Sequence, residues 1–152
     1  MIQRIQSLYF LLSAVSTMLT LFFPFFTYSN GKESVYALNL FSLFEVNTGE
    51  LVRIPWGILS LGLLSFVLAI VVIFMYENRK RQIKFSMYLF QVSLLGFVTC
   101  WVYGISYANT YSLDYHWHFT IGLLLLSSIF AVLGLLAVRK DEKLVRAADR
   151  IR

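Results

Sequence analysis

Both histidines of the chain lie in the stretch DYHWHF, residues 114–119, next to an acidic residue. Imidazole nitrogens and carboxylate oxygens bind zinc, and histidine is also the side chain that titrates near neutral pH. On a helix, His116 and His118 would point about 200° apart and could not share a metal, whereas on a strand they would share a face. Further ligands would have to come from Glu33, Glu45 and Glu50. We expect an entry turn whose Asp114 caps the following helix, and no metal, cofactor or catalytic residue.

Long apolar stretches dominate the rest of the sequence. Of the 152 residues, 59% are hydrophobic, whereas soluble domains are about 45–50% apolar. A run of about 20 uncharged residues can cross a bilayer as a helix, which satisfies its own backbone hydrogen bonds. The sequence therefore predicts an all-α membrane protein, a four-transmembrane-helix bundle that forms one domain over residues 1–152. The expected spans cover about residues 5–28, 54–76, 85–108 and 118–138.

Positive charge is distributed unevenly among the segments between these spans. Of the 13 lysines and arginines, only Lys32 and Arg53 fall in the loops 29–53 and 109–117. The others fall at the N-terminus, in the loop 77–84 or in an expected tail helix, 139–152. Basic segments remain in the cytoplasm, so we expect both termini there, two outer loops, and no role for the net charge of +5 in binding nucleic acid.

Aromatic residues mark the expected membrane interfaces. Those near the outer surface are Tyr28, Trp56, Trp101, Tyr107, Tyr111, Tyr115 and Trp117. Such side chains keep their apolar rings in lipid and their polar tips in water. They are therefore assigned to an interfacial belt.

Small residues recur at helical spacing in the expected spans. Those of the third and fourth spans are Gly96, Cys100, Gly104, Ala131 and Gly134. Small side chains let helix backbones approach closely in membranes. Because every expected span has such a stripe, helix packing within the molecule is favoured over a dimerisation face.

The expected outer loop 29–53 is more apolar than a solvated linker. Its segment FEVNTGELVRI, residues 44–54, is typical of two extended runs around a turn that contains Gly49. The alternative is a short interfacial helix that turns Leu38, Phe41 and Phe44 to lipid. In both cases the loop is expected to cover the outer end of the helices.

The basic residues of the loop 77–84 and of the tail are the expected contacts with anionic lipid or a partner protein. They are Arg79, Lys80, Arg81, Lys84, Arg139, Lys140, Lys143, Arg146 and Arg150. Each basic residue near anionic lipid adds about 1 kcal/mol of attraction. The tail also carries Asp141, Glu142 and Asp149, which a lipid anchor does not need. Two alternatives stay open: lipid binding with packing on the loop 77–84, and binding of a partner.

The two ends of the chain carry a resemblance to a known family. The opening MIQRIQSLYFLLS with a following FFP, and the closing KDEKLVRAADRIR, resemble short inner-membrane proteins of Bacteroidota that are known only as a domain of unknown function. The middle of the chain matches that family only in hydropathy. The resemblance implies a multi-pass protein of the bacterial inner membrane with a compact four-helix bundle. It brings no activity, cofactor or catalytic residue.

The interiors of the expected spans contain no acidic or basic residue. Ion-coupled carriers and proton pumps usually need one. We therefore expect a protein that is not an enzyme but a subunit or scaffold of a membrane assembly, with membrane lipids and other inner-membrane proteins as partners. The alternative is a small transporter or channel for an apolar or lipid-like compound. That alternative predicts a cavity near Ser13, Thr17, Gln91 and Thr99.

Overall fold

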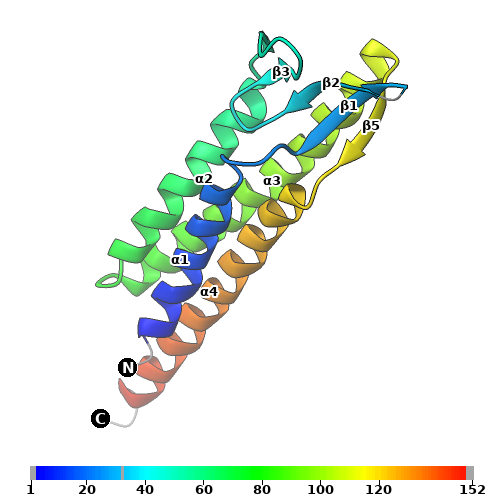
Figure 1. Ribbon diagram of the computed structural model, residues 1–152. Helices are drawn as coiled ribbons and strands as arrows, with labels where there is room; N and C mark the ends of the chain where they lie inside the picture. Colours follow the sequence, from blue (N-terminus) through cyan, green and yellow to red (C-terminus); the bar gives the residue numbers. More distant parts are fainter. Residues whose placement is uncertain (1–2, 32, 150–152) are drawn as a thin grey trace.

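In the described part of the chain, four helices run side by side, and a sheet lies across one end of them (Figure 1). The structure, a computed structural model, describes residues 3–31 and 33–149. The helices are α1 (Gln3–Leu19), α2 (Trp56–Phe74), α3 (Arg79–Tyr111) and α4 (Thr120–Asp149). The strands are β1 (Phe26–Asn30), β2 (Glu33–Leu38), β3 (Leu43–Glu45), β4 (Leu51–Arg53) and β5 (Asp114–Trp117). We call the end that carries the sheet the sheet end, and the opposite end, where α1 begins and α4 ends, the terminal end.

The expectation of an all-α four-helix bundle is wrong. The described residues form a mixed fold of four helices and a five-stranded antiparallel sheet. Helix α1 packs on α2 and α4, and α3 packs on the same two helices. The strands come from both expected outer loops and from the end of the first expected span. These segments therefore form a structural layer of their own.

The first expected span, residues 5–28, ends as a helix at Leu19. The amides of residues 20–22 donate to carbonyls three residues earlier, at 3.0–3.2 Å, which tightens the last turn. Pro24 then offers no amide donor and cannot continue a helix. The amide of Phe25 instead donates a 2.8 Å hydrogen bond to β2. The apolar run therefore changes from helix to strand partway along, because proline interrupts the helical hydrogen bonds.

The sheet is antiparallel in the order β4-β3-β2-β1-β5. Strand β5 pairs with the edge of β1 that faces away from β2, with His116 opposite Thr27. Successive side chains of a strand point to opposite faces. Phe26 and Tyr28 accordingly point toward the helices, and each is at most 1% exposed. Strand β1 thus carries much of the contact between the sheet and the helices.

Residues 43–53 form a hairpin, and the interpretation of this loop as an interfacial helix is wrong. Strand β3 pairs with β4. Gly49 in the turn has a φ of 70°, a left-handed conformation that costs glycine little. Leu38, which an interfacial helix would turn to lipid, is fully buried.

Helices α3 and α4 extend beyond their expected spans toward the terminal end. Most of the expected loop 77–84 is the start of α3, where the side chain of Asn78 accepts a 3.3 Å hydrogen bond from the amide of Arg81. This bond satisfies one of the free amides of the first turn. The tail is continuous with α4 as far as Asp149, and its expected remainder, 150–152, lies outside the described residues.

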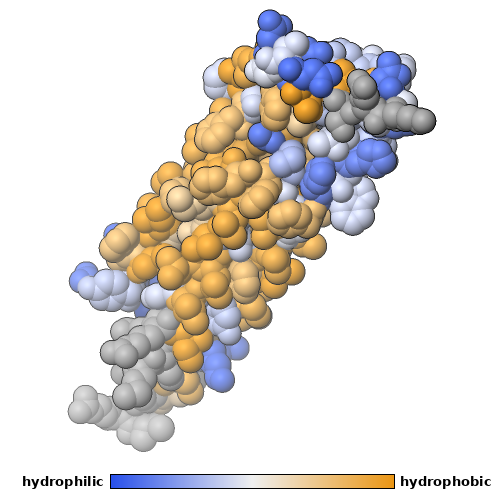
Figure 2. Space-filling view, in the orientation of Figure 1, coloured by the Kyte–Doolittle hydropathy of each residue, from blue (hydrophilic) through white to orange (hydrophobic). Residues whose placement is uncertain are grey.

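Three helices of the described part are long and apolar enough to cross a membrane, over Trp56–Phe74, Arg79–Tyr111 and Thr120–Val145. A shorter apolar helix covers Ile5–Leu19. Apolar side chains cover the flanks of the helices, and hydrophilic ones gather toward the ends (Figure 2). More than half of the residue's surface is exposed at Leu11, Val67, Val102 and Leu136, one on each helix. Monomeric soluble proteins rarely expose apolar surface this extensively.

Two buried clusters fill the interior. The cluster at the sheet end joins Phe26, Tyr28 and Leu38 of the sheet to residues of α2, α3 and α4. The second cluster joins all four helices and includes Phe10 and Ala131. The helices therefore hold one another over most of their length, and the sheet adds a second set of contacts at one end.

Candidate functional site at the sheet end

The sheet is attached to α3 through β1. The hydroxyl of Tyr28 donates a 3.1 Å hydrogen bond to the main-chain carbonyl of Gly104. The ring of Phe26 lies so close to Gly104 that a Cβ atom at this position would overlap it. Trp101 packs edge-on against the same ring, with the centroids 5.6 Å apart. These contacts fix the sheet end of α3 beneath the sheet.

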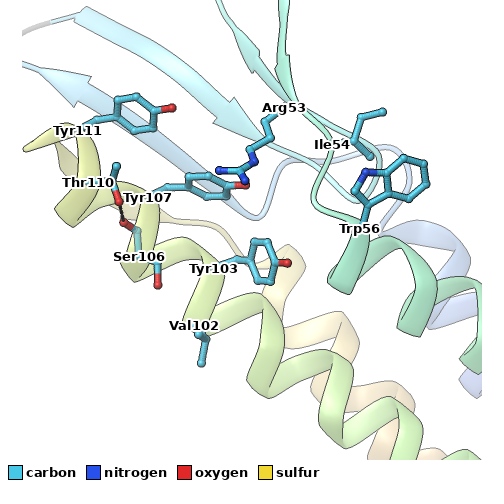
Figure 3. Close-up of a pocket in the computed structure, with 9 residues that line it drawn as sticks. All are labelled: Arg53, Ile54, Trp56, Val102, Tyr103, Ser106, Tyr107, Thr110 and Tyr111. Atoms are coloured by element: carbon cyan, nitrogen blue, oxygen red, sulfur yellow. Dashed lines mark hydrogen bonds between the residues drawn. The ribbon is translucent and has the colours of Figure 1, made fainter.

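A cleft lies beside this contact, between α3 and the segment that leads from β4 into α2 (Figure 3). Its volume is about 290 Å³. The segment contributes Arg53, Ile54 and Trp56. Helix α3 contributes one face, on which residues recur three or four positions apart, namely Val102, Tyr103, Ser106, Tyr107, Thr110 and Tyr111. We call this site the tyrosine cleft.

Arg53 is the cation of the tyrosine cleft. Its guanidinium extends over the cleft toward Tyr107, and the two groups are close enough to interact electrostatically (Figure 3). Arg53 is exposed, and no acidic side chain among the described residues forms an ion pair with it. A guanidinium presents five N–H donors in a planar array that matches carboxylate and phosphate oxygens. The cleft is therefore suited to an anionic group.

The phenol rings of the cleft are held by neighbours on other elements. Tyr103 packs on the first turn of α2, where a Cβ atom at Gly57 would lie 3.1 Å from both the hydroxyl oxygen and Cε2 of the tyrosine. The rings of Tyr103 and Tyr107 have centroids 5.9 Å apart. Tyr111 contacts Tyr36 of β2 at the same separation. Because α2, α3 and β2 all position these rings, the cleft is preformed.

The polar residues of α1 are bonded to α4. The hydroxyl of Ser127 lies 2.9 Å from that of Ser13 and 2.9 Å from that of Thr17. All three side chains are buried. A cavity was expected near Ser13, Thr17, Gln91 and Thr99. Ser13 and Thr17 lie instead in a hydrogen-bonded seam, Gln91 is exposed and Thr99 is half-buried. Thr17 also borders a different cavity.

A second cavity, of about 180 Å³, lies between α1, α2 and the turn after β2. Its lining is almost entirely apolar and consists of Thr17, Met18, Leu21, Leu40, Phe41, Gly62, Leu63 and Phe66. Apolar cavities of about 150 Å³ can bind small apolar molecules. We call this site the apolar cavity.

The interpretation of Asp114 as a helix cap is wrong. Asp114 lies in β5, opposite Ser29 of β1. Helix α4 begins only at Thr120. The acidic residue is drawn into the sheet because β1 offers a free edge for pairing, which outweighs the local preference of aspartate for a helix start.

His116 lies in the edge strand β5, and His118 is the first residue after it. His118 is anchored at two points: its amide donates a 2.9 Å hydrogen bond to the carbonyl of Phe25, and its Nε2 lies 3.1 Å from the hydroxyl of Thr27. His116 is exposed on β5. Among residues 3–31 and 33–149, no group of three or more His, Cys, Asp and Glu side chains could hold a metal ion.

At the terminal end, Arg79 and Asp141 form an ion pair with an N···O distance of 3.5 Å. Asp141 is buried, so the pair ties the start of α3 to the tail portion of α4. The other basic residues predicted to contact lipid or a partner are exposed, namely Lys80, Arg81, Lys84, Arg139, Lys140 and Lys143. The side chain of Arg146 and the whole of Arg150 lie outside the described part.

The predicted small residues of α3 and α4 are buried inside the molecule, namely Gly96, Cys100, Gly104, Ala131 and Gly134. Gly134 receives the ring of Phe10 from α1, just as Gly104 receives Phe26. Both glycines therefore serve contacts within the chain.

The tyrosine cleft was not among the sites predicted from sequence. Tyr107 and Tyr111 were assigned to an interfacial belt, and Arg53 was counted only as an outer charge. A signal was present, since Tyr103, Tyr107 and Tyr111 recur every four residues and so share one helix face. What sequence did not show is that the hairpin brings Arg53 over that face.

Comparisons with known proteins add a family. The profile of a family described as a domain of unknown function (DUF4293) matches residues 2–151. The match covers the helices, the sheet and the tyrosine cleft alike. No curated protein matches the chain.

Proposed function

The chain belongs to this family of domains of unknown function. From the geometry, we propose that it is a multi-pass protein of the bacterial inner membrane with both termini in the cytoplasm. It acts as a non-enzymatic subunit or scaffold of a membrane assembly. In this placement the helices cross the bilayer, the terminal end faces the cytoplasm and the sheet end faces outward.

The apolar flanks of the helices support the membrane placement. Three helices have the length and hydropathy of membrane spans. Helix α1 has 17 residues, which is about 25 Å at 1.5 Å per residue. The apolar residues 21–23 continue from it toward the sheet, so this shorter crossing still reaches across most of a core of about 30 Å.

The distribution of basic residues supports the orientation. The exposed basic residues of α3 and α4, including Lys80 and Lys140, lie in the first turns of α3 and the last part of α4, which the Arg79–Asp141 ion pair joins at the terminal end. Arg53 lies at the sheet end. Because basic segments are retained in the cytoplasm, the terminal end is placed there.

The observation that carries the scaffold role is the open edge of the sheet at β4. The three residues of β4 are all exposed, and Leu51 and Val52 are 60% and 43% exposed. An open strand edge leaves backbone N–H and C=O groups free to pair with a strand from another chain. Exposed apolar side chains beside such an edge add buried surface when a partner strand is added. We infer that β4 is where a partner protein joins the sheet.

Capture of partners at native expression tests this role. The full chain is extracted in mild detergent, and the proteins retained with it are quantified by mass spectrometry. Val52→Lys should reduce a stoichiometric partner several-fold, because lysine on an edge strand discourages pairing. Asn47→Lys, in the exposed turn before β4, is the matched control and should retain the partner. A wild-type protein that purifies alone, or equal capture by both variants, would refute the role.

Partner binding at the terminal end is tested with point variants and not with a deletion. Deletion of residues 140–152 would remove Asp141 and with it the ion pair to Arg79. Lys140→Gln and Lys143→Gln alter exposed positions only. If the terminal end binds a partner, these variants lower its capture while the protein remains folded.

Reporter fusions test the orientation. A reporter active only in the cytoplasm should be active when fused after residue 152 and inactive when inserted at Asn47. The reverse pattern would contradict the proposed topology without depending on any partner.

A second candidate, carriage of an apolar or lipid-like compound, is favoured by the apolar cavity. Met18→Trp would fill this cavity from α1. If the cavity carries a compound, small apolar molecules that co-purify with wild-type protein should be absent from the variant. Equal amounts in both would exclude this cavity as the site.

A further inference from the structure

We propose that the tyrosine cleft binds the phosphate group of a phospholipid from the leaflet at the sheet end. This inference rests on the membrane placement proposed above and adds a ligand that the scaffold role does not require. The phosphate lies beside Arg53, and the acyl chains run along the flank of the helices.

The cleft is polar at one side and apolar at the other, as a phospholipid is polar at its headgroup and apolar along its acyl chains. At one side Arg53 projects from the sheet. At the other side the lining includes Val102, which is 57% exposed on the apolar flank of α3. Trp56, at the first turn of α2, also lines the cleft and is 67% exposed. Tryptophan favours the headgroup level of a bilayer, so the cleft lies where a lipid phosphate would be.

The charges around the cleft favour an anion. The guanidinium of Arg53 has no acidic partner among the described residues. The start of α2 supports the same preference, since its first turn contains no acidic residue and Pro55 makes no side-chain cap. The positive end of that helix dipole is therefore uncompensated. The hydroxyls of Tyr103 and Ser106 add groups that can donate to phosphate oxygens.

The shape of the cleft favours a lipid over a free anion. A volume of about 290 Å³ accommodates a phosphate with its glycerol, but not two acyl chains in addition. The chains would have to leave the cleft past Val102, along the exposed apolar side chains of the preceding turns of α3, such as Val98 and Leu95. A ligand without acyl chains would gain no binding energy from the flank of α3, because that surface offers only apolar contacts.

Three probes separate the sources of the phosphate. Full-length protein in detergent is incubated with dioleoyl phosphatidylglycerol, with dioleoylglycerol, or with glycerol 3-phosphate, and retention is measured by native mass spectrometry. Phosphatidylglycerol should be retained, and the other two should not. Retention of dioleoylglycerol to the same extent would show that the cleft does not recognise the phosphate. Equal retention of glycerol 3-phosphate would show that the cleft binds free anions without needing acyl chains. Either result overturns the proposal.

Variants assign the binding to the cleft. Arg53→Gln should weaken binding of phosphatidylglycerol about tenfold or more, because a hydrogen-bonded charge pair is lost. Arg53→Lys should restore part of it through charge alone. Arg81→Gln, which removes an exposed cation from the other end of the molecule, should bind as the wild type does. Equal weakening by Arg53→Gln and Arg81→Gln would show unspecific attraction to anionic lipid and would overturn the proposal.

A second variant keeps the test independent of the sheet edge. Tyr103→Phe removes one hydroxyl from the cleft and leaves β4 intact, so it should weaken lipid binding several-fold while partner capture is unchanged. Unchanged lipid binding in both Tyr103→Phe and Arg53→Gln would refute the site. Loss of partner capture by Val52→Lys is measured separately, so either proposal can fail without the other.

Discussion

The hydroxyl of Tyr28 in β1 donates a 3.1 Å hydrogen bond to the carbonyl of Gly104 in α3, and the two residues are 76 positions apart in the chain. Tyr28 is 1% exposed. The bond joins the sheet to the helices at a place where neither group can reach water. It therefore holds the sheet against the end of α3.

Removal of this hydroxyl should destabilise the protein modestly. We expect Tyr28→Phe to lower the free energy of unfolding by about 1 kcal/mol, the usual net value of a hydrogen bond. The effect stays small because Gly104 lies inside α3, where its carbonyl also takes part in helical bonding. Thermal unfolding in detergent measures it. Tyr115→Phe removes an exposed hydroxyl and is the control; an equal effect of both would contradict a specific bond.

The same tyrosine should make stability depend on pH in the alkaline range. Burial raises the pKa of Tyr28 above its ordinary value of 10.0, and the nearby Cys100 and Tyr107 act in the same direction. The folded state then holds this proton more tightly than the unfolded state. The resulting stability is fully present below about pH 10 and is lost as the pH rises above it. Wild-type protein should lose stability more steeply than Tyr28→Phe between about pH 10 and 11; parallel curves would argue against it.

Gly104 and Gly122 provide a matched pair of helical glycines. A Cβ atom at Gly104 would overlap the ring of Phe26, whereas one at Gly122 would meet nothing within 4 Å. We expect Gly104→Ala to cost about 1–3 kcal/mol through overpacking, and Gly122→Ala to be neutral or stabilising by up to about 1 kcal/mol through helix propensity. Unfolding midpoints compare the two. A neutral Gly104→Ala would mean that the sheet can move away from α3 at little cost.

Ser127 and Ser128 are neighbours on α4 that are both buried but bonded differently. Ser127 bonds across to Ser13 and Thr17 of α1, whereas Ser128 donates to the carbonyl of Leu125 in its own helix. Ser127→Ala should cost about 1 kcal/mol, within the range for hydrogen bonds between membrane helices. Ser128→Ala should cost clearly less. The free energy of unfolding of both variants is measured in detergent. Equal losses of stability would show that the hydrogen bonds between α1 and α4 do not contribute to stability.

The ion pair between Arg79 and Asp141 can be measured by a double-mutant cycle. The side chains are 27% and 11% exposed, so the pair is partly screened, and we expect a coupling of about 1 kcal/mol between Arg79→Gln and Asp141→Asn. Lys80 is exposed one position further along. A cycle between Lys80→Gln and Asp141→Asn should give a coupling near zero. High salt should reduce the first coupling and leave the second unchanged.

The sequence predicted the helices better than the sheet. Uncharged length is a strong signal, and α2, α3 and α4 lie where the apolar runs predicted them. The same signal misassigned residues 20–28, because hydropathy counts Phe25 and Phe26 as membrane residues whether they form helix or strand. The helix ends before Pro24, and β2 and β5 offer β1 the hydrogen bonds that a helix would have supplied.

The tyrosine cleft depends on contacts that local patterns do not specify. The tyrosines of α3 are periodic and could be assigned to one face. Arg53 reaches that face only because β4 is the outermost strand of a sheet whose order follows from pairings distant in sequence. Strand β5 was missed for a similar reason, since it is only four residues long and pairs with β1, which lies far earlier in the chain.

The pairing of β1 with β5 has a consequence for biosynthesis. Thr27 and His118, which are bonded at this edge, are separated by 91 residues. While the ribosome makes α2 and α3, the outer side of β1 has no strand to pair with. The nascent chain thus exposes an unfinished sheet until β5 has been made, just before α4, and an extrinsic peptide that mimics β5 could arrest maturation at that stage.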